Sequence, residues 1–225
     1  MLPSGARVGF YDDRLRRRFL REKELEDRFP HALANGEFHM YLQPKVALPE
    51  RRIVGAEALV RWISPEGMLC PNEFVPLFER DGVIAELDFY MFCQVCALLK
   101  RWEREGRPLF CVSVNVSRSN FDVSDFFARY ERHIAENQVP ARYLEFEFTE
   151  SVVFDRTGEI NQVIRRIHAL GARCSMDDFG SSYSSLNMLR SLEVDIIKLD
   201  QGFFRGDTDM DKARSIVNGI VGIRS

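Results

Sequence analysis

The sequence lacks several features that would place it in a functional class at once. Its longest apolar runs are far too short to cross a bilayer, and residues 1–10 mix proline, glycine and arginine where a secretory signal would be apolar. The net charge is only −3, so nothing in the composition calls for nonspecific binding to a nucleic-acid polymer. We therefore expect a cytoplasmic protein with no direct membrane insertion.

Cysteine is scarce and odd in number, with five in 225 residues. An odd count in a chain of this length favours a reducing compartment over a disulfide framework. Cys93 and Cys96 have the C-x-x-C spacing, but they lie inside a helical pattern and no second pair accompanies them. We expect core packing there instead of a zinc site.

A glycine-rich phosphate loop is also missing, since neither G-x-G-x-x-G nor a Walker loop occurs. What is present is an alternation of apolar strands and amphipathic helices with short connections, typical of a mainly parallel sheet covered by helices. The first two strands are close enough to form a hairpin. We expect strands at 38–44, 52–63, 110–116, 143–149, 173–177 and 195–199, and helices at 71–80, 84–105, 124–137 (capped by Ser124), 159–170, 184–190 and 208–223.

Residues 11–29 are dense in charge of both signs, with a narrow apolar stripe at helical spacing. This pattern predicts a solvated helix of the kind that often joins two domains. A membrane-surface helix is the alternative, and the interspersed acidic residues argue against it. We divide the chain into a linker helix at 1–29 and a globular domain at 30–225.

The chemically interesting residues occur near the C-terminal ends of successive strands, where a (β/α) barrel builds its site. An open doubly wound sheet is the competing fold, and the missing glycine-rich loop favours the barrel. About six strands are expected after Phe38, whereas a complete barrel needs eight. The fold is therefore smaller than a full barrel, or the chain is a fragment.

Asp177 and Asp178 form an acidic pair at the end of an expected strand, before Phe179 and Gly180. Neighbouring side chains of a strand point to opposite faces, so both carboxylates reach one site only if the backbone turns there. Two carboxylates so close require a positive partner, which favours a divalent-metal site. A solvated acidic turn is the alternative.

Further polar residues accompany this pair on other strands. Glu57 lies in an apolar run, where an unpaired carboxylate is costly, although a salt bridge to Arg61 would also explain it. Lys198 lies in a similarly apolar strand and requires carboxylates nearby. Oxygen donors suit Mg²⁺ or Mn²⁺, and such metals beside a lysine fit phosphoryl chemistry. The set is Glu57, Asn115, Glu147, Asp177, Asp178 and Lys198, and Glu145 shares one strand face with Glu147.

Several motifs resemble one family in order. Glu57-Ala58-Leu59 is similar to the signature of EAL domains, which hydrolyse the bacterial second messenger cyclic di-GMP to linear pGpG. The supporting segments are Tyr41-Leu42-Gln43-Pro44, 71–79, Asn115-Val116-Ser117, 147–151, Asp177-Asp178-Phe179-Gly180, Tyr183-Ser184-Ser185-Leu186 and Lys198-Leu199-Asp200. The resemblance implies a TIM-like (β/α)₈ barrel with one antiparallel strand near its start.

The resemblance also implies a role for each matching residue. Glu57, Asn115, Glu147 and Asp177 would bind a first Mg²⁺ or Mn²⁺ ion, and Asp178 would hold a second and help position the water. Lys198 would orient that water, so Glu57, Asp178 and Lys198 are the predicted catalytic residues. Gln43, Leu59 and Arg61 would bind substrate, and Glu150 would anchor the loop after Asp178, which influences metal binding and dimerisation in the family.

Two departures from the family bear on activity. Ser182 stands where the family usually has glycine, which puts the loop geometry in doubt. The last two strands, with a further glutamate and a Gln-Gly motif, are absent before Ser225. We expect a truncated EAL domain with weak or no activity as an isolated chain, from a parent with an upstream GGDEF domain. A cyclic di-GMP sensor without turnover and a protein-interaction module are the alternatives.

Overall fold

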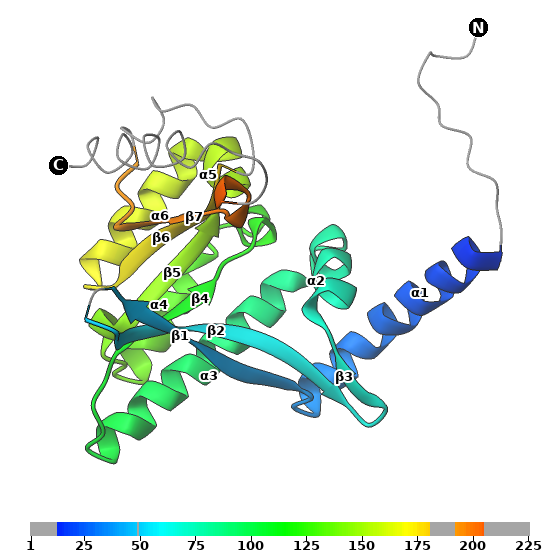
Figure 1. Cartoon of the computed structure of the whole chain (residues 1–225), viewed down its shortest axis with the longest axis horizontal. Helices are drawn as coiled ribbons and strands as arrows, with labels where there is room; N and C mark the ends of the chain where they lie inside the picture. Colours follow the sequence, from blue (N-terminus) through cyan, green and yellow to red (C-terminus); the bar gives the residue numbers. More distant parts are fainter. Residues whose placement is uncertain (1–12, 49, 181–191, 205–225) are drawn as a thin grey trace, which may run out of the picture.

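The computed structural model describes residues 13–48, 50–180 and 192–204, and it confirms the expected mixed α/β architecture. These residues form one open seven-stranded sheet in the order β1-β2-β4-β5-β6-β7, with β3 paired to β2 (Figure 1). The strands are β1 (Phe38–Ala47), β2 (Arg52–Ser64), β3 (Gly67–Leu69), β4 (Cys111–Asn115), β5 (Leu144–Thr149), β6 (Arg173–Phe179) and β7 (Ile196–Leu199). β1 and β3 are antiparallel to β2, which confirms the hairpin, and β2, β4, β5, β6 and β7 are parallel.

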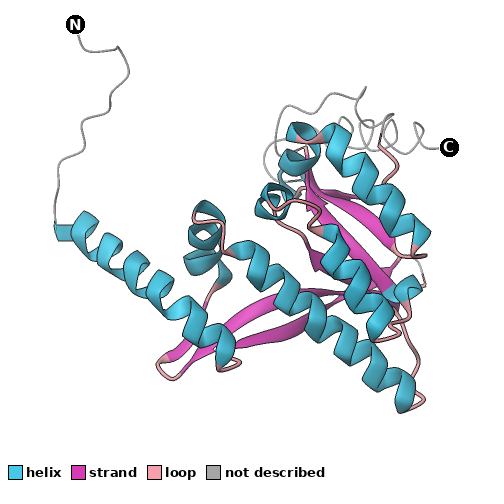
Figure 2. Ribbon diagram, turned by 180° about the vertical axis from the view of Figure 1, so that it is seen from behind, coloured by secondary structure: helices cyan, strands magenta, loops and turns pink. Residues whose placement is uncertain are grey.

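The helices are α1 (Asp13–Ala34), α2 (Pro71–Arg80), α3 (Ile84–Arg104), α4 (Phe127–Glu136), α5 (Glu150–Asp155) and α6 (Thr157–Ala169), with short 3₁₀ helices η1 (Arg118–Asp122), η2 (Ala141–Tyr143) and η3 (Gln201–Phe204). Helices α3, α4 and α6 cover one face of the sheet, whereas α1 extends away from it, as Figure 2 shows. The helices expected at 184–190 and 208–223 and the motif residues 181–186 lie outside the described residues. No helix in the described part of the chain is long and apolar enough to span a bilayer.

Three local expectations were wrong. α4 begins at Phe127 and not at Ser124, because Asp125 has a φ of 49°, which a helix cannot contain. β6 continues to Phe179 instead of ending at Asp177, since a register irregularity lets the strand resume after the acidic pair. The short helix α5 was not expected, and it directly follows β5.

Two apolar clusters hold these layers together. The larger lies between the parallel strands and α3, α4 and α6, and it contains the fully buried rings of Phe92 and Phe146. The smaller surrounds Trp62 where the β1–β2 pair meets α2, and it includes Leu25 and Phe29 from the second half of α1. The last turns of α1 therefore pack on the globular part, whereas the division of the chain at residue 29 stays a prediction.

Gly55 allows β2 and β4 to approach closely. It pairs with Cys111, and a Cβ atom at Gly55 would lie 2.8 Å from the backbone carbonyl oxygen of Cys111, which cannot move without breaking the ladder. We expect Gly55→Ala to lower the free energy of unfolding by about 1–3 kcal/mol, as overpacking does. Urea denaturation followed by circular dichroism measures this change.

Gly158→Ala is the matched control, because no atom lies within 4 Å of a Cβ at Gly158, in the first turn of α6. That substitution is expected to leave the free energy of unfolding unchanged or raise it by up to about 1 kcal/mol. If the two substitutions changed the free energy of unfolding equally, close contact between β2 and β4 would not be the reason that residue 55 is glycine.

Candidate active site

The C-terminal ends of the parallel strands bring the predicted polar residues to one edge of the sheet. Asn115 of β4 pairs with Glu147 of β5, and Asp177 of β6 pairs with Thr149, two residues further along β5. Alternate residues of a strand share a face, so Glu147 and Asp177 project from the same side. Glu57 joins them from β2, where it pairs with Ser113.

Lys198 of β7 lies at the centre of this group. Its Nζ atom is 2.8 Å from an oxygen of Glu57, 2.8 Å from one of Glu147 and 2.9 Å from one of Asp177. Burial alone would lower the pKa of Lys198, but the charge of Glu147 and the three hydrogen bonds outweigh burial and raise it. The ammonium group is therefore firmly protonated, and a carboxylate set around Lys198 is present as the sequence required.

A second lysine contacts the same carboxylates from the other side. Lys45 of β1 lies 2.9 Å from Glu145 and 2.8 Å from the second oxygen of Glu147. Burial would raise the pKa of Glu147, but Lys198 and Lys45 together lower it. Sequence reasoning missed Lys45, although the hairpin register, which sets Lys45 opposite Gly55 and Gln43 opposite Glu57, would have revealed its position.

Glu57, Glu147 and Asp177 also form a set that could hold a metal ion. One carboxylate oxygen from each lies within 4.8 Å of the other two. Asn115 adds an amide, whose nitrogen donates to the second oxygen of Glu57 at 3.3 Å. Carboxylate and amide oxygens are the ligands that Mg²⁺ and Mn²⁺ prefer, so the donor set fits these ions.

Asp178 reaches the same region through an unusual backbone conformation. Its φ is 56°, and its N–H donates to a side-chain oxygen of Asp177 at 2.8 Å. The expected turn between the two residues is thus present, inside β6 instead of after it. Burial, followed by the nearby charge of Asp177, raises the pKa of Asp178.

Both aspartates line a pocket of about 490 Å³, together with Glu57, Lys198 and residues 199–202. Behind it, the buried carboxylate of Glu150 accepts a hydrogen bond from the N–H of Gly180 at 2.7 Å. This contact fixes the backbone two residues after Asp178. Its role in the loop beyond stays a prediction.

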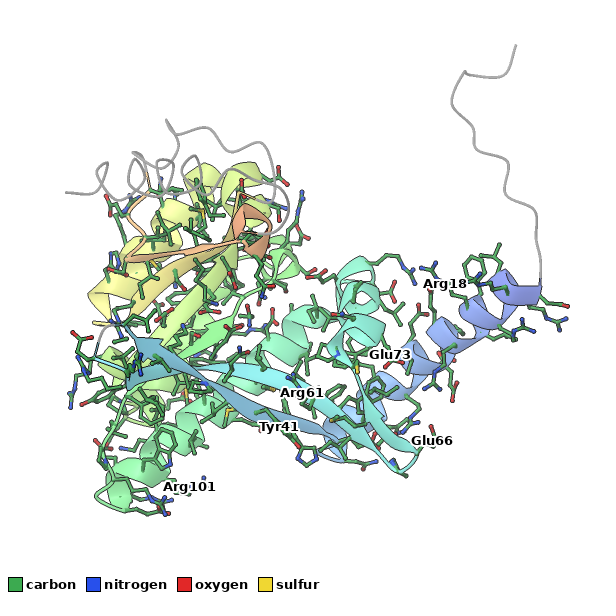
Figure 3. The ribbon with its side chains drawn as sticks, viewed as in Figure 1. Arg18, Tyr41, Arg61, Glu66, Glu73 and Arg101 are labelled. Carbon is green, nitrogen blue, oxygen red and sulfur yellow. The ribbon has the colours of Figure 1, made fainter. Side chains whose placement is uncertain are left out.

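Leu59 and Arg61 line a neighbouring pocket of about 200 Å³ that also borders Asn115 and Glu147. The guanidinium group of Arg61 lies over the ring of Tyr41, 5.7 Å from its centroid, and Figure 3 shows the two side chains together on the β1–β2 pair. Arg61 donates to the carbonyl of Val60, whereas Glu57 pairs with Lys198. The suggested Glu57–Arg61 salt bridge is therefore not the contact that the described residues make.

Asp88 of α3 lines this second pocket, and sequence reasoning missed it as well. Its buried carboxylate accepts hydrogen bonds of 2.8 Å from the N–H of Ser117 and from the amide of Asn120. Desolvation dominates over these donors and raises the pKa of Asp88 to about 6. Nothing in the helical pattern of α3 distinguishes Asp88 from a surface residue, so only the packing of η1 reveals it.

The raised pKa of Asp88 predicts a pH-dependent stability. The stability that this group contributes is fully present below its unfolded pKa of about 4 and is lost as the pH rises through about 6. We expect the free energy of unfolding of the wild type, relative to Asp88→Asn, to fall by about 2 kcal/mol between pH 4.5 and 7. Urea titrations at both pH values measure it, and a flat or rising difference would contradict the prediction.

The sequence of this chain matches that of a known protein family. The model of the EAL domain family matches residues 26–224. The chain belongs to the EAL domain family. Its open mixed α/β sheet, in which β1 and β3 are antiparallel to β2, is consistent with part of the family's TIM-like barrel.

Curated relatives of this EAL domain include two proteins of Pseudomonas aeruginosa. Cyclic di-GMP phosphodiesterase PA2567 is 36% identical over 189 residues, covering 84% of this chain and 32% of the relative. Cyclic di-GMP phosphodiesterase NbdA is 30% identical over 213 residues, covering 92% of this chain and 27% of the relative. The chain thus spans about a third or less of the length of these relatives.

Solved structures show the same fold. The PaMucR phosphodiesterase in complex with c-di-GMP superposes with a TM-score of 0.80 at 28% identity, covering 89% of this chain and 81% of that one. The EAL enzyme Bd1971, bound to cAMP and cyclic di-GMP, superposes with a TM-score of 0.77 at 26% identity, covering 91% and 57%. Both neighbours bind cyclic di-GMP, and both are named as enzymes.

Proposed function

We propose that this EAL domain is a metal-dependent phosphodiesterase that hydrolyses cyclic di-GMP to linear pGpG. The observation that carries the proposal is the group of Glu57, Glu147 and Asp177 around Lys198, at the strand ends where barrels place their sites. The relatives named cyclic di-GMP phosphodiesterases support the choice of substrate.

Glu57, Asn115, Glu147 and Asp177 would hold one Mg²⁺ or Mn²⁺ ion, and Asp178 would hold a second. When bound, such ions lower the pKa of a water molecule and neutralise charge on the phosphate. Partial burial and then the nearby charge of Asp177 raise the pKa of Asp178, and a cation in the shared pocket would offset both effects.

The protein's own side chains have separate tasks in this proposal. Lys198 stays protonated and donates a hydrogen bond to the attacking water, holding its oxygen toward the phosphorus. The water oxygen forms a new bond to phosphorus as one bridging phosphorus–oxygen bond breaks, and the proton that the water gives up is taken up by the leaving oxygen. Lys45 forms ion pairs with Glu145 and with the second oxygen of Glu147, which helps to keep the Glu147 carboxylate ionised and oriented.

Arg61 and Gln43 would bind the substrate beside the metals. Arg61 is held over Tyr41, so its guanidinium group is positioned to contact a phosphate with little loss of side-chain freedom. The pocket next to it has an apolar lining from Leu59, Ile84 and Met91, which suits the flat face of a purine base.

A sensor that binds cyclic di-GMP without hydrolysis is the second candidate. One observation favours it: Lys198 already forms ion pairs with all three carboxylates, so a metal ion has to compete with the ammonium group for their oxygens. The presence of Glu57, Asn115, Glu147, Asp177 and Asp178, all the metal ligands that the resemblance implies within this length, still favours the enzyme.

The test uses the whole gene product that contains residues 1–225, purified with EDTA and then dialysed. We expect chromatography to show conversion of cyclic di-GMP to pGpG with Mn²⁺ or Mg²⁺ and none with EDTA. Calorimetry with Ca²⁺ measures binding separately. Binding without turnover at any metal concentration would establish the sensor, and absence of both would overturn the proposal.

We also propose that the protein forms a homodimer and that a GGDEF or other sensor domain lies upstream of this chain. The helix α1, which precedes the globular part, is in keeping with such an arrangement. Light scattering after size exclusion tests the first, and a single mass at the monomer value over the micromolar range would exclude it.

A further inference from the structure

A second group of metal-binding side chains lies away from the candidate active site. It consists of His168 at the end of α6, Cys174 near the start of β6, and Asp195 just before β7. The Nε2 atom of His168 is 3.0 Å from an oxygen of Asp195 and 3.8 Å from the sulfur of Cys174. One donor atom from each residue lies within 4.8 Å of the other two.

This group is separate from the acidic cluster on the same strand. Cys174 precedes Asp177 by three residues, which corresponds to about 10 Å along β6. The odd spacing also sends the two side chains to opposite faces of the sheet. Cys174 therefore belongs to the face that the helices cover, and it is fully buried there.

We propose that His168, Cys174 and Asp195 form a second metal site, which binds Zn²⁺ or a cation of similar softness. A nitrogen, a thiolate and a carboxylate are zinc donors, whereas Mg²⁺ and Mn²⁺ prefer oxygen alone. Zinc bond lengths of about 2.0–2.3 Å at tetrahedral angles place neighbouring donors about 3.3–3.7 Å apart. The spacings of 3.0 Å from His168 to Asp195 and 3.8 Å from His168 to Cys174 lie within a few tenths of an ångström of that range, and a donor oxygen of Asp195 lies within 4.8 Å of the Cys174 sulfur.

Backbone hydrogen bonds hold the donors in place before any ion binds. The N–H of Cys174 donates to the Asp195 carboxylate at 2.8 Å, and the N–H of Asp195 donates to the carbonyl of Cys174 at 2.9 Å. The side chains of His168 and Asp195 are each 34% exposed, so water can occupy a fourth position. The site is therefore preorganised on its protein side and open on its solvent side.

The other cysteine–histidine contact in the described part of the chain is different. The sulfur of Cys93 lies 3.7 Å from the Nδ1 atom of His133, but no third donor completes that pair within the described residues. Cys96 is buried in the apolar core, as expected from the helical pattern in which it lies. Cys93 is thus a matched control: a cysteine beside a histidine without a complete donor set.

A bound ion would connect the end of α6 to the starts of β6 and β7. Its binding is expected to raise the melting temperature, because the unfolded chain does not bring these three residues together. Since the thiol must lose its proton, affinity for the ion should increase with pH. Neither effect involves the residues proposed to bind catalytic metals.

Co²⁺ is the probe, because a thiolate ligand gives it a near-ultraviolet charge-transfer band that oxygen ligands do not. We titrate the protein with Co²⁺ in the Asp177→Asn background, so that the acidic cluster contributes less binding. The band is expected to reach its full intensity at one equivalent of Co²⁺ per chain and to disappear when one equivalent of Zn²⁺ is added. Cys174→Ser should abolish it, and Cys93→Ser should leave it intact.

Because Cys174 is buried, Cys174→Ser could lose Co²⁺ binding through misfolding alone, so two further variants are tested. His168→Gln and Asp195→Asn keep the core intact, as circular dichroism would verify, and each should weaken Co²⁺ binding by at least about 10-fold. The proposal is overturned if the wild type shows no thiolate band, if Cys93→Ser removes the band, or if His168→Gln and Asp195→Asn both bind Co²⁺ as tightly as the wild type.

Discussion

Asp177→Asn is expected to lower the rate of cyclic di-GMP hydrolysis by at least about 100-fold at saturating Mg²⁺ or Mn²⁺. The substitution replaces one of three clustered carboxylates with a neutral amide of nearly the same shape. It removes one of the proposed metal ligands and one ion pair of Lys198, while the hydrogen bond from the N–H of Asp178 to the side-chain oxygen can be kept. The measurement is initial-rate formation of pGpG over a range of metal concentrations.

Asp155→Asn is the control for this prediction. Asp155 is an exposed carboxylate that pairs with Arg118 at 2.5 Å on the surface, so its loss should change the rate less than about 2-fold. Binding of cyclic di-GMP in Ca²⁺ reports whether Asp177→Asn has lost the ligand site as well. Turnover within 10-fold of the wild type would rule out Asp177 as a required ligand.

Lys198→Met is expected to destabilise the metal-free protein by about 2–4 kcal/mol. Without the ammonium group, Glu57, Glu147 and Asp177 repel one another, and only Lys45, which pairs with the almost completely buried Glu147, is left to offset that repulsion. We place the value below that of a fully buried pair, because the Lys198 side chain is 22% exposed and solvent screens part of the interaction. Urea denaturation in EDTA measures the effect.

A divalent cation should reverse much of this loss of stability. In Lys198→Met the three carboxylates are free for a metal, so millimolar Mn²⁺ is expected to raise the free energy of unfolding more in the variant than in the wild type. Lys100→Met, which removes an exposed partner of Glu103, should cost less than about 1 kcal/mol and respond to Mn²⁺ like the wild type. If Mn²⁺ stabilises the wild type and Lys198→Met equally, the carboxylates do not form the metal site.

Individual strands show why the sequence was so informative at the candidate active site. Glu57, Glu147 and Lys198 each interrupt an apolar strand, and an unpaired charge in such a strand is costly. Each therefore had to face another charge, and parallel strands align their C-terminal ends at one edge of the sheet. The prediction for the acidic pair also held in its essential point: Asp177 and Asp178 reach one pocket because the backbone turns between them.

The sequence pattern did not predict where α4 begins or where β6 ends. Serine is a residue type that often caps a helix, so Ser124 looked like the start of α4. Asp125, however, has a positive φ, and α4 begins only at Phe127. Asp177 looked like the end of a strand, but β6 resumes at Phe179, where its partner β7 is available. At the start of α4 the backbone conformation of Asp125 overrides local propensity, and at the end of β6 the position of β7 does.

By itself the sequence determined the alternation of strands and helices, the edge of the sheet where the chemistry lies, and the residues at that edge. It could do so because burial restricts charged residues to positions where they meet a partner. Only the tertiary structure decided which partners meet. Lys45 pairs with Glu145 across 100 positions, and Asp88 is buried by η1. The convergence of His168, Cys174 and Asp195 depends on how α6 packs against β6 and β7. These contacts follow from strand register and helix packing, which no local pattern of residue types specifies.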